Sequence, residues 1–405
     1  FQLAGRAHLL LMEAKNGHLS IAELLIQKGA RLDLQNDAGH TALHRAASRG
    51  HTELMKTLVK AGAPIHTLDL KGKTPIHLAA ENRHLKSVKL LVEEEARQSE
   101  SHRQNMFLHM AAMEDDWRLA ELLLQSGATV DALNSQDGLT PLHIASMQGH
   151  TDTVIQLLHN KAEPGVTDRL GRTALHWAAF SQVDSCVVDL LLSAKADPDA
   201  TDNEKKTPLH LAAMEGKVDV AISLLSHRAK RRARDMDGST PLHYAAAGGH
   251  VSVVTALLQP LNNKGTEDRN AWRKTPLHAA AEKGHDSVAL RLLEAGAKIN
   301  ATDHNKDTPL HCAARGGHHK VMKILVNWGQ AGNVGWRNKA NLQAKNNIGK
   351  TPLQVAETKH TPEHENTAIL LKRKMNLIIS LHSNKFLLLL MYPNSHLLTP
   401  NSSVL

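Results

Sequence analysis

The stretch "TPLHLAAMEGK", residues 207–217, decides the fold because its first four residues recur along the chain. Close copies begin at 41, 74, 140, 173, 207, 240, 275 and 308, and weaker copies begin at 106 and 351. Neighbouring copies up to 308 are 32–35 residues apart. One period before Thr41 lies His8, so the pattern predicts eleven units from about residue 8 to 374. A fixed period of this length indicates an array in which each repeat is one supersecondary unit.

The parts of each unit follow the same order, and each part has a physical reason. Thr is a good N-cap, and Pro in the first helical turn loses no hydrogen bond. An Ala-Ala pair lets two short helices approach closely, and a Leu-Leu-x-x-Gly ending closes the second helix. Because one pair of short helices cannot bury its apolar face alone, neighbouring units must bury each other.

A period near 33 with T-P-L-H-x-A resembles the ankyrin-repeat family over more than nine-tenths of the chain. The resemblance implies an all-α repeat solenoid of paired antiparallel helices with β-hairpin fingers. We expect the array to occupy residues 1–375 and a non-repeat tail, disordered or isoform-specific, to occupy 376–405. More loosely, the chain resembles proteins that join ankyrin repeats to a C-terminal death domain, but no six-helix pattern follows residue 375.

Composition narrows the class of protein. Aromatic residues make up only 3 % of the chain, which suits small aliphatic cores, and the net charge of +8 is modest for 405 residues. Cys186 and Cys312 are the two cysteines, so no disulfide framework is expected and the compartment is predicted to be reducing. Neither a signal peptide nor a membrane-spanning run stands out. We therefore expect a cytoplasmic protein, with the nucleus as a second location.

Most of the 28 histidines occupy repeat positions rather than a cluster of their own. Nine are the last residue of the TPLH motif and seven more end the first helix, as in Gly-His. In the family, the first kind bridges Thr and backbone groups of adjacent units. "HTPEH" (360–364) matches a zinc-protease pattern, but Pro362 disfavours one helix through both histidines. We expect no catalytic site, no cofactor and no metal.

Function is sought where the units differ. Members of the ankyrin-repeat family contact partners through the finger tips and the residues just before the helix-end glycine, so the resemblance implies partner contacts at the same positions here. We call the seventh residue after the first residue of the motif position +7. It is small or charged in most units but apolar in four successive ones, at Met113, Met147, Phe180 and Met214. With Trp177 and Tyr244 beside them, these residues predict an apolar stripe in a concave groove, or else side chains that fold onto the core.

The fingers beside this stripe are basic, through Arg169, Arg172, Lys205, Lys206, Arg231 and Arg232. A protein partner with an apolar face and acidic flanks would fit both features. "AKRRAR" (229–234) is interpreted as a solvated finger, with a nuclear-import tract as the alternative. The extra residues 330–339, with Trp336, predict a loop that either serves binding or is a remnant of an alternative exon.

The predicted function is a non-catalytic, monomeric interaction scaffold or adaptor, with a role in signalling, that binds a protein segment in its groove. The alternative is a nuclear or chromatin-associated factor whose basic fingers contact nucleic acid or acidic partners. The low aromatic count and the lack of a nucleic-acid module favour the first.

Overall fold

The structure is a computed structural model that describes residues 2–99, 107–181, 185–259, 264–329 and 339–391. The described residues are helical, with turns between the helices and no strand. This confirms the predicted all-α repeat solenoid. The predicted β-hairpin fingers are tight turns, and their described residues form no strands.

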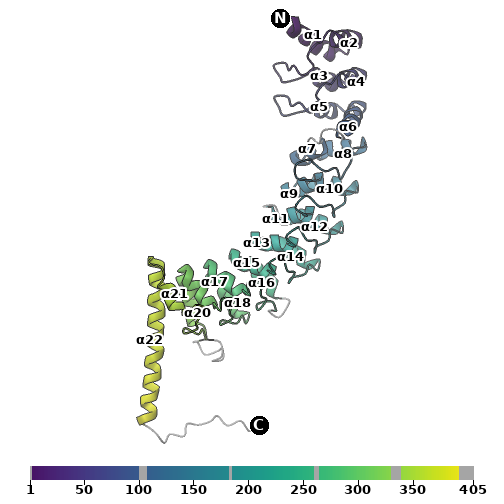
Figure 1. Ribbon diagram of the computed structural model, residues 1–405. Coiled ribbons are helices and arrows are strands. Elements are labelled where there is room, and N and C mark those ends of the chain that lie inside the picture. The colour runs from purple at the N-terminus through teal and green to yellow at the C-terminus, as the bar shows by residue number, and fades with distance from the viewer. Residues whose placement is uncertain (1, 100–106, 182–184, 260–263, 330–338, 392–405) are drawn as a thin grey trace, which may run out of the picture. The chain divides into compact units, whose positions relative to one another are not determined.

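The chain forms two units, which we describe separately. Unit 1 contains residues 1–208 and 223–229, and unit 2 contains residues 209–222 and 230–405. The helices of unit 1 (Figure 1) are α1 (Gln2–Asn16), α2 (Leu19–Gln27), α3 (Ala42–Arg49), α4 (Thr52–Lys60), α5 (Pro75–Glu81), α6 (Leu85–Ser99), α7 (Phe107–Glu114), α8 (Trp117–Gln125), α9 (Pro141–Gln148), α10 (Thr151–His159), α11 (Ala174–Phe180) and α12 (Cys186–Ser193).

Helices α13 (Pro208–Glu215) and α14 (Val218–Ser226) contain the boundary between the units. The helices that follow in unit 2 are α15 (Pro241–Gly248), α16 (Val251–Leu258), α17 (Pro276–Lys283), α18 (Asp286–Glu294), α19 (Pro309–Gly316), α20 (His319–Asn327), α21 (Pro352–Ala356) and α22 (Pro362–Met391). Because α22 continues through residue 375, the boundary of the array at 375 stays a prediction.

Stacking follows the repeat in each unit. First helices pack on first helices, as α15 does on α17, and second helices pack on second helices, as α16 does on α18. The Ala-Ala pairs lie in these contacts, and Ala46, Ala47, Ala280 and Ala281 are completely buried. Burying one leucine of the second helices contributes about 1.5–3 kcal/mol, so stability grows with each added neighbour.

The fingers are closed by one side chain each. Asp69 accepts hydrogen bonds from the backbone amides of Lys71 (2.8 Å) and Lys73 (2.9 Å), and the Asp69 amide bonds back to the Lys73 carbonyl. One finger then bonds to the next, as Leu70 N does to Ala38 O at 3.1 Å. Asp and Asn favour such turns because their side chains replace a backbone acceptor.

The junction between the third and fourth repeats departs from this pattern. Where other second helices end at a glycine such as Gly62, Glu95 stands, and α6 continues to Ser99. Glu95 accepts a hydrogen bond from the Phe107 amide at 2.6 Å, so it caps α7 from the preceding repeat. Among the described residues, α5 does not stack on α7; α6 packs on α8 instead.

Burial makes this cap sensitive to protonation. Glu95 is only 8 % exposed, and burial raises its pKa to about 8. The imidazole of His66 lies 3.5 Å from the Glu95 carboxyl group, and burial lowers the pKa of His66. At neutral pH this contact therefore joins a carboxylic acid and a neutral imidazole rather than two charges.

The loop predicted at residues 330–339 falls almost wholly outside the described residues. Trp336 lies there, with all of the segment except Lys339.

Candidate functional site: the histidine staples and the apolar position

Most of the TPLH histidines both cap their own helix and bond to the next repeat; in the described residues His109 Nδ1 and His77 Nε2 are the exceptions. His44 Nδ1 accepts from the Thr41 amide at 3.1 Å, and Nε2 lies 3.0 Å from the Lys73 carbonyl. Since Nδ1 accepts, the proton sits on Nε2, which donates. The same bond to the next repeat, at 2.9–3.1 Å, is made by His109, His143, His176, His210, His243, His278 and His311.

Burial and hydrogen bonding hold these histidines in a neutral, structural state. Burial lowers the pKa of His44, and it lowers the pKa of His278 to about 4. Both rings are completely buried and both nitrogens are engaged. The residues that the structure describes contain no cluster of His, Cys, Asp and Glu that could hold a metal ion. The prediction that the TPLH histidines are structural is confirmed.

The helix-end histidines form a second staple, which sequence reasoning did not predict. His250 donates from Nε2 to the carbonyl of position +7 in the preceding repeat, Met214 (2.9 Å), and His318 does so to Glu282 (2.9 Å), whereas His150 bonds through Nδ1 to the Ala112 carbonyl (2.8 Å). His51, His285 and His364 make equivalent bonds. The backbone at position +7 is therefore fixed while its side chain is free to vary.

These rings explain the preceding glycines. Gly284 has φ +81°, and a Cβ placed there would lie 2.5 Å from the ring of His318. Gly249 has the same relation to His285. Each glycine is needed both for its left-handed backbone and for the close approach of the next repeat.

One histidine of the "HTPEH" segment also bonds to the preceding repeat. His364 lies in the first turn of α22, its Nδ1 is 2.7 Å from Thr361 Oγ1 and its Nε2 bonds to the Arg315 carbonyl. His360 precedes the helix. The predicted loop thus extends to Thr361, and His364 is a staple rather than one of a pair of zinc ligands.

Position +7 pairs with the residue just before the motif, which we call position −1. Lys73 at −1 forms an ion pair with Glu81 at +7, and Lys274 does so with Glu282 at 2.7 Å. In the repeat beginning at 308 the charges are reversed, and Arg315 bonds to Asp307. Charged residues at +7 therefore have a partner within their own repeat.

The apolar residues at +7 in unit 1 remain accessible. Met113 is 57 % exposed, Phe180 is 38 % exposed and Met147 is half-buried. We call these three residues, together with Trp177, the apolar face of unit 1. Such exposure in consecutive repeats does not fit the alternative of core packing for Met113 and Phe180.

An aromatic cluster fixes one end of this face. The indole of Trp177 donates to Asp168 at 2.8 Å and lies edge-on to the Phe180 ring, with centroids 6.4 Å apart. The guanidinium of Arg172, at position −1, lies 5.1 Å from the Trp177 centroid and 5.9 Å from that of Phe180. A cation–π contact here replaces the ion pair of other repeats.

Met214 and Tyr244 occupy the corresponding positions of unit 2. Met214 is half-buried, and the Tyr244 hydroxyl donates to Asp235 at 2.6 Å, as Trp177 does to Asp168. The ring of Tyr244 lies edge-on to His210 with centroids 5.9 Å apart. They are therefore separate from the apolar face of unit 1.

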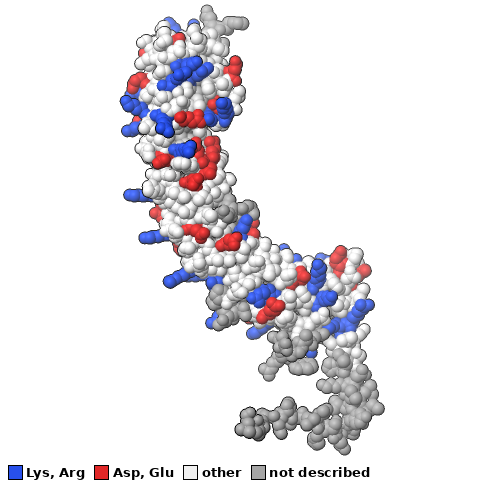
Figure 2. All heavy atoms as spheres, turned by 180° about the vertical axis from the view of Figure 1, so that it is seen from behind, with Lys and Arg blue, Asp and Glu red and all other residues white. Residues whose placement is uncertain are grey.

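Most of the predicted basic finger residues are engaged within the array. Arg169 donates to the carbonyls of Ser135 (2.6 Å) and Gln136, and Arg232 bonds to Asp268. Arg231 donates to the Ala256 carbonyl, and Lys206 forms an ion pair with Glu204. Lys205 is exposed. Figure 2 shows Lys and Arg interspersed with Asp and Glu on the face in view rather than a continuous basic stripe.

Comparison with known sequences agrees with this geometry. A family described as "Ankyrin repeats (3 copies)" matches residues 10–102, 108–202, 181–268, 230–303 and 277–379. The chain belongs to the ankyrin-repeat family. Ankyrin repeats are protein-interaction modules.

The chain is also similar to parts of larger proteins. It is 38 % identical over 69 residues to the palmitoyltransferase Hip14 of Drosophila melanogaster, covering 17 % of this chain and 11 % of that protein. It is 37 % identical over 75 residues to the putative palmitoyltransferase ZDHHC13 of Danio rerio, covering 18 % and 12 %. It is 39 % identical over 75 residues to protein PhlB of Serratia liquefaciens, which covers 18 % of this chain and 33 % of that protein.

The chain thus spans about a tenth of the length of these palmitoyltransferases. Their matched part is the repeat region and not a catalytic domain. In the described part of the chain, no helix combines the length and the apolar character that crossing a bilayer requires.

Proposed function

We propose that this chain is a non-catalytic adaptor and that the apolar face of unit 1 binds an apolar segment of a partner protein. The observation that carries the proposal is the change at position +7. The repeats beginning at 74, 275 and 308 place a charge paired with position −1, whereas those beginning at 106, 140 and 173 carry Met, Met and Phe, of which Met113 and Phe180 are exposed and Met147 is half-buried. Exposed apolar patches of this kind are typical of protein contacts.

The aromatic cluster supports the same proposal. Trp, Phe and Arg offer large rigid contact area at low entropic cost, and Trp and Arg are enriched at the centres of interfaces. Arg172 is held between two rings and beside Asp202 at 3.6 Å, so the cluster is preorganised. Acidic flanks of a partner would meet the exposed Lys205.

The alternative of a nucleic-acid-binding factor has less support. Arg169, Arg231 and Arg232 form the bonds described above, and phosphate binding would have to break them. A nucleic-acid complex would also lose affinity steeply with added salt.

The test is affinity capture followed by measured binding of each captured protein to purified chain. Met113→Glu combined with Phe180→Glu should weaken binding at least about tenfold, since the loss of interface hot spots costs this much or more. A new Glu at 180 can pair with Arg172, as Glu81 pairs with Lys73, so the fold should be retained. Ile155→Glu on α10, at a residue 43 % exposed, is the matched control. Equal loss in the control, or unfolding of the double variant, would refute the proposed face.

A further inference from the structure

The finger tips of unit 2 carry a second feature that the adaptor proposal does not use. We call the residue two before the motif position −2. At this position the backbone is left-handed, and glycine occupies it in most repeats, as at Gly238 (φ +69°) and Gly349 (φ +74°). In two adjacent fingers of unit 2 it is instead Arg273 (φ +58°) and Lys306 (φ +57°).

A left-handed backbone is unfavourable for side chains such as these. Only Gly, and sometimes Asn or Asp, adopts it readily, because Cβ crowds the backbone. Strain held in a well-determined loop often marks a functional site. Lysine and arginine adopt a left-handed backbone elsewhere in the chain as well, as at Lys195 and Lys205, but in unit 2 the two such cations at position −2 lie on neighbouring fingers.

The fingers that hold them are rigid. The Trp272 carbonyl accepts from the His304 amide at 3.0 Å, and the Asn305 carbonyl accepts from the Asn347 amide at 2.8 Å. Within each finger, Asp303 takes the amides of Asn305 and Asp307 at 2.9 Å. The fingers thus form a bonded ladder along one edge of unit 2.

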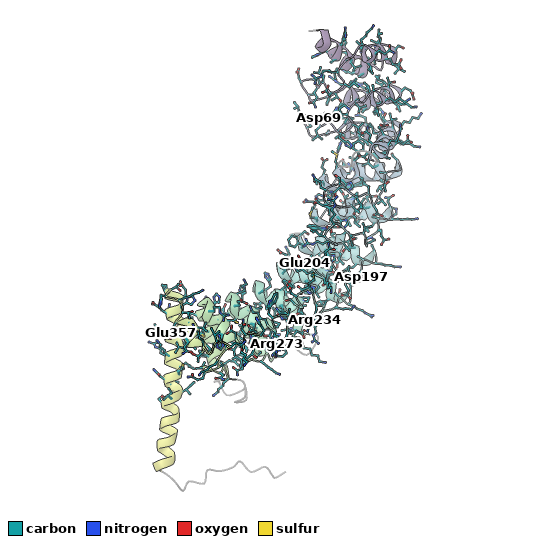
Figure 3. All side chains as sticks on the ribbon, viewed as in Figure 1. Asp69, Asp197, Glu204, Arg234, Arg273 and Glu357 are labelled. Carbon is teal, nitrogen blue, oxygen red and sulfur yellow. The ribbon has the colours of Figure 1, made fainter. Side chains whose placement is uncertain are left out.

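Along this ladder the exposed side chains are cationic, apolar or neutral and polar, the last as at Asn305 and Asn347. Trp272 is 46 % exposed and Ile348 is 72 % exposed, at equivalent positions of their fingers. Arg273 and Lys306 are exposed, and their charged groups have no hydrogen bond or ion pair within the described ranges. By contrast Arg234, on the preceding finger (Figure 3), donates to the carbonyls of Gly238 and Arg269.

The carboxylates of these fingers face inward. Asp303 is 4 % exposed and Asp307 is 1 % exposed, and Asp307 also accepts from Asn346 at 2.9 Å and from Arg315. An exposed acidic residue, Asp237, stands on the preceding finger, at the position equivalent to Trp272. The outward charge beside Trp272 is therefore positive.

We propose that Trp272, Arg273, Lys306 and Ile348 form a docking surface for an acidic protein segment that carries an apolar side chain. The cations select the charge of the segment, and the indole and the isoleucine receive its apolar residue. Aromatic and arginine side chains on a rigid support are typical centres of binding energy. This surface lies in unit 2 and does not depend on the apolar face of unit 1.

The test uses the full chain and a short fluorescent peptide in which glutamates flank a central leucine, with anisotropy as readout. Arg273→Gly and Lys306→Gly should each weaken binding several-fold, and together at least about tenfold. Both should leave the melting temperature unchanged or higher, because glycine relieves the strain. Trp272→Ala should weaken binding by a similar factor.

The matched control is Lys195→Gly, which removes an exposed cation from an equally left-handed backbone, at φ +66°, in unit 1. It should relieve the same strain without changing the affinity for the peptide. A peptide with glutamine in place of glutamate should not bind. Binding that is unchanged by Arg273→Gly and Lys306→Gly, equal binding of the glutamine peptide, or tighter binding of duplex DNA through the same residues would overturn the proposal.

Discussion

The junction between the repeats beginning at 275 and 308 differs from the junction between those beginning at 74 and 106. In the first, two histidines hold the repeats together: His278 bonds to the Asp307 carbonyl and His318 bonds to the Glu282 carbonyl. In the second, Asp116 stands where the helix-end histidine would be, and buried Glu95 caps α7. One fold therefore uses two chemistries, with opposite responses to pH.

The largest expected effect breaks the regular junction. Gly284→Ala forces a side chain into a left-handed backbone and against the ring of His318, so we expect a loss of about 3 kcal/mol in the free energy of unfolding. Urea titration measures it. Gly296→Ala, at φ +90° with no atom within 4 Å of the new Cβ, should lose only about 1 kcal/mol. Equal losses would show that the ring contact does not matter.

The next effect concerns Glu95. Because its pKa is raised to about 8, the folded state holds a proton that the unfolded state has lost, so stability falls as pH rises from about 4.5 to 8. Glu95→Gln keeps an acceptor for the Phe107 amide and should be more stable than the wild type by about 2 kcal/mol at pH 9. Urea titrations across this pH range measure the difference. The exposed Glu81→Gln is the control. A wild-type curve that is flat over this range would contradict the account.

The regular junction should respond in the other direction. The pKa of His278 is lowered to about 4, so below pH 6.5 the unfolded state binds a proton that the folded state does not, and stability falls on acidification. His278→Gln should cost about 1 kcal/mol at neutral pH, since the bond to Asp307 is lost, and should make the acid decline shallower. Gln354 already accepts from the Thr351 amide at 2.9 Å, which shows that Gln can serve as the cap. The test is to measure the melting temperatures of the wild type and the variant from pH 4 to 7. If both fall equally steeply on acidification, the result would count against the staple.

The smallest effect concerns position +7. Glu282→Met removes the ion pair with Lys274 and should change stability by less than about 0.5 kcal/mol, because exposed pairs contribute little. It should create an apolar residue like Met113 without disturbing the His318 bond to the carbonyl of residue 282. Calorimetry with the wild type as reference is sufficient. A loss several times larger would mean that the ion pair, and not the backbone staple, holds the helix end.

The period and the T-P-L-H motif by themselves determine the helix pairs, the N-caps and the structural role of His278, because these depend on local geometry repeated at fixed spacing. The apolar residues at position +7 were also visible in the sequence, although their exposure was not. Whether Met113 and Phe180 face solvent depends on which neighbours cover them, and only the tertiary structure decides this.

Other features required the contacts between repeats. The basic fingers read as free charge in sequence, but Arg169 and Arg232 are bonded to neighbouring repeats. Glu95 follows two other glutamates in the sequence, yet it is buried and caps a helix that begins 12 residues further along the chain. A charge pattern cannot show which partner a side chain will find across a junction. The sequence thus determined the repeat, and the packing between repeats decided which of its departures are buried, bonded or left available for a partner.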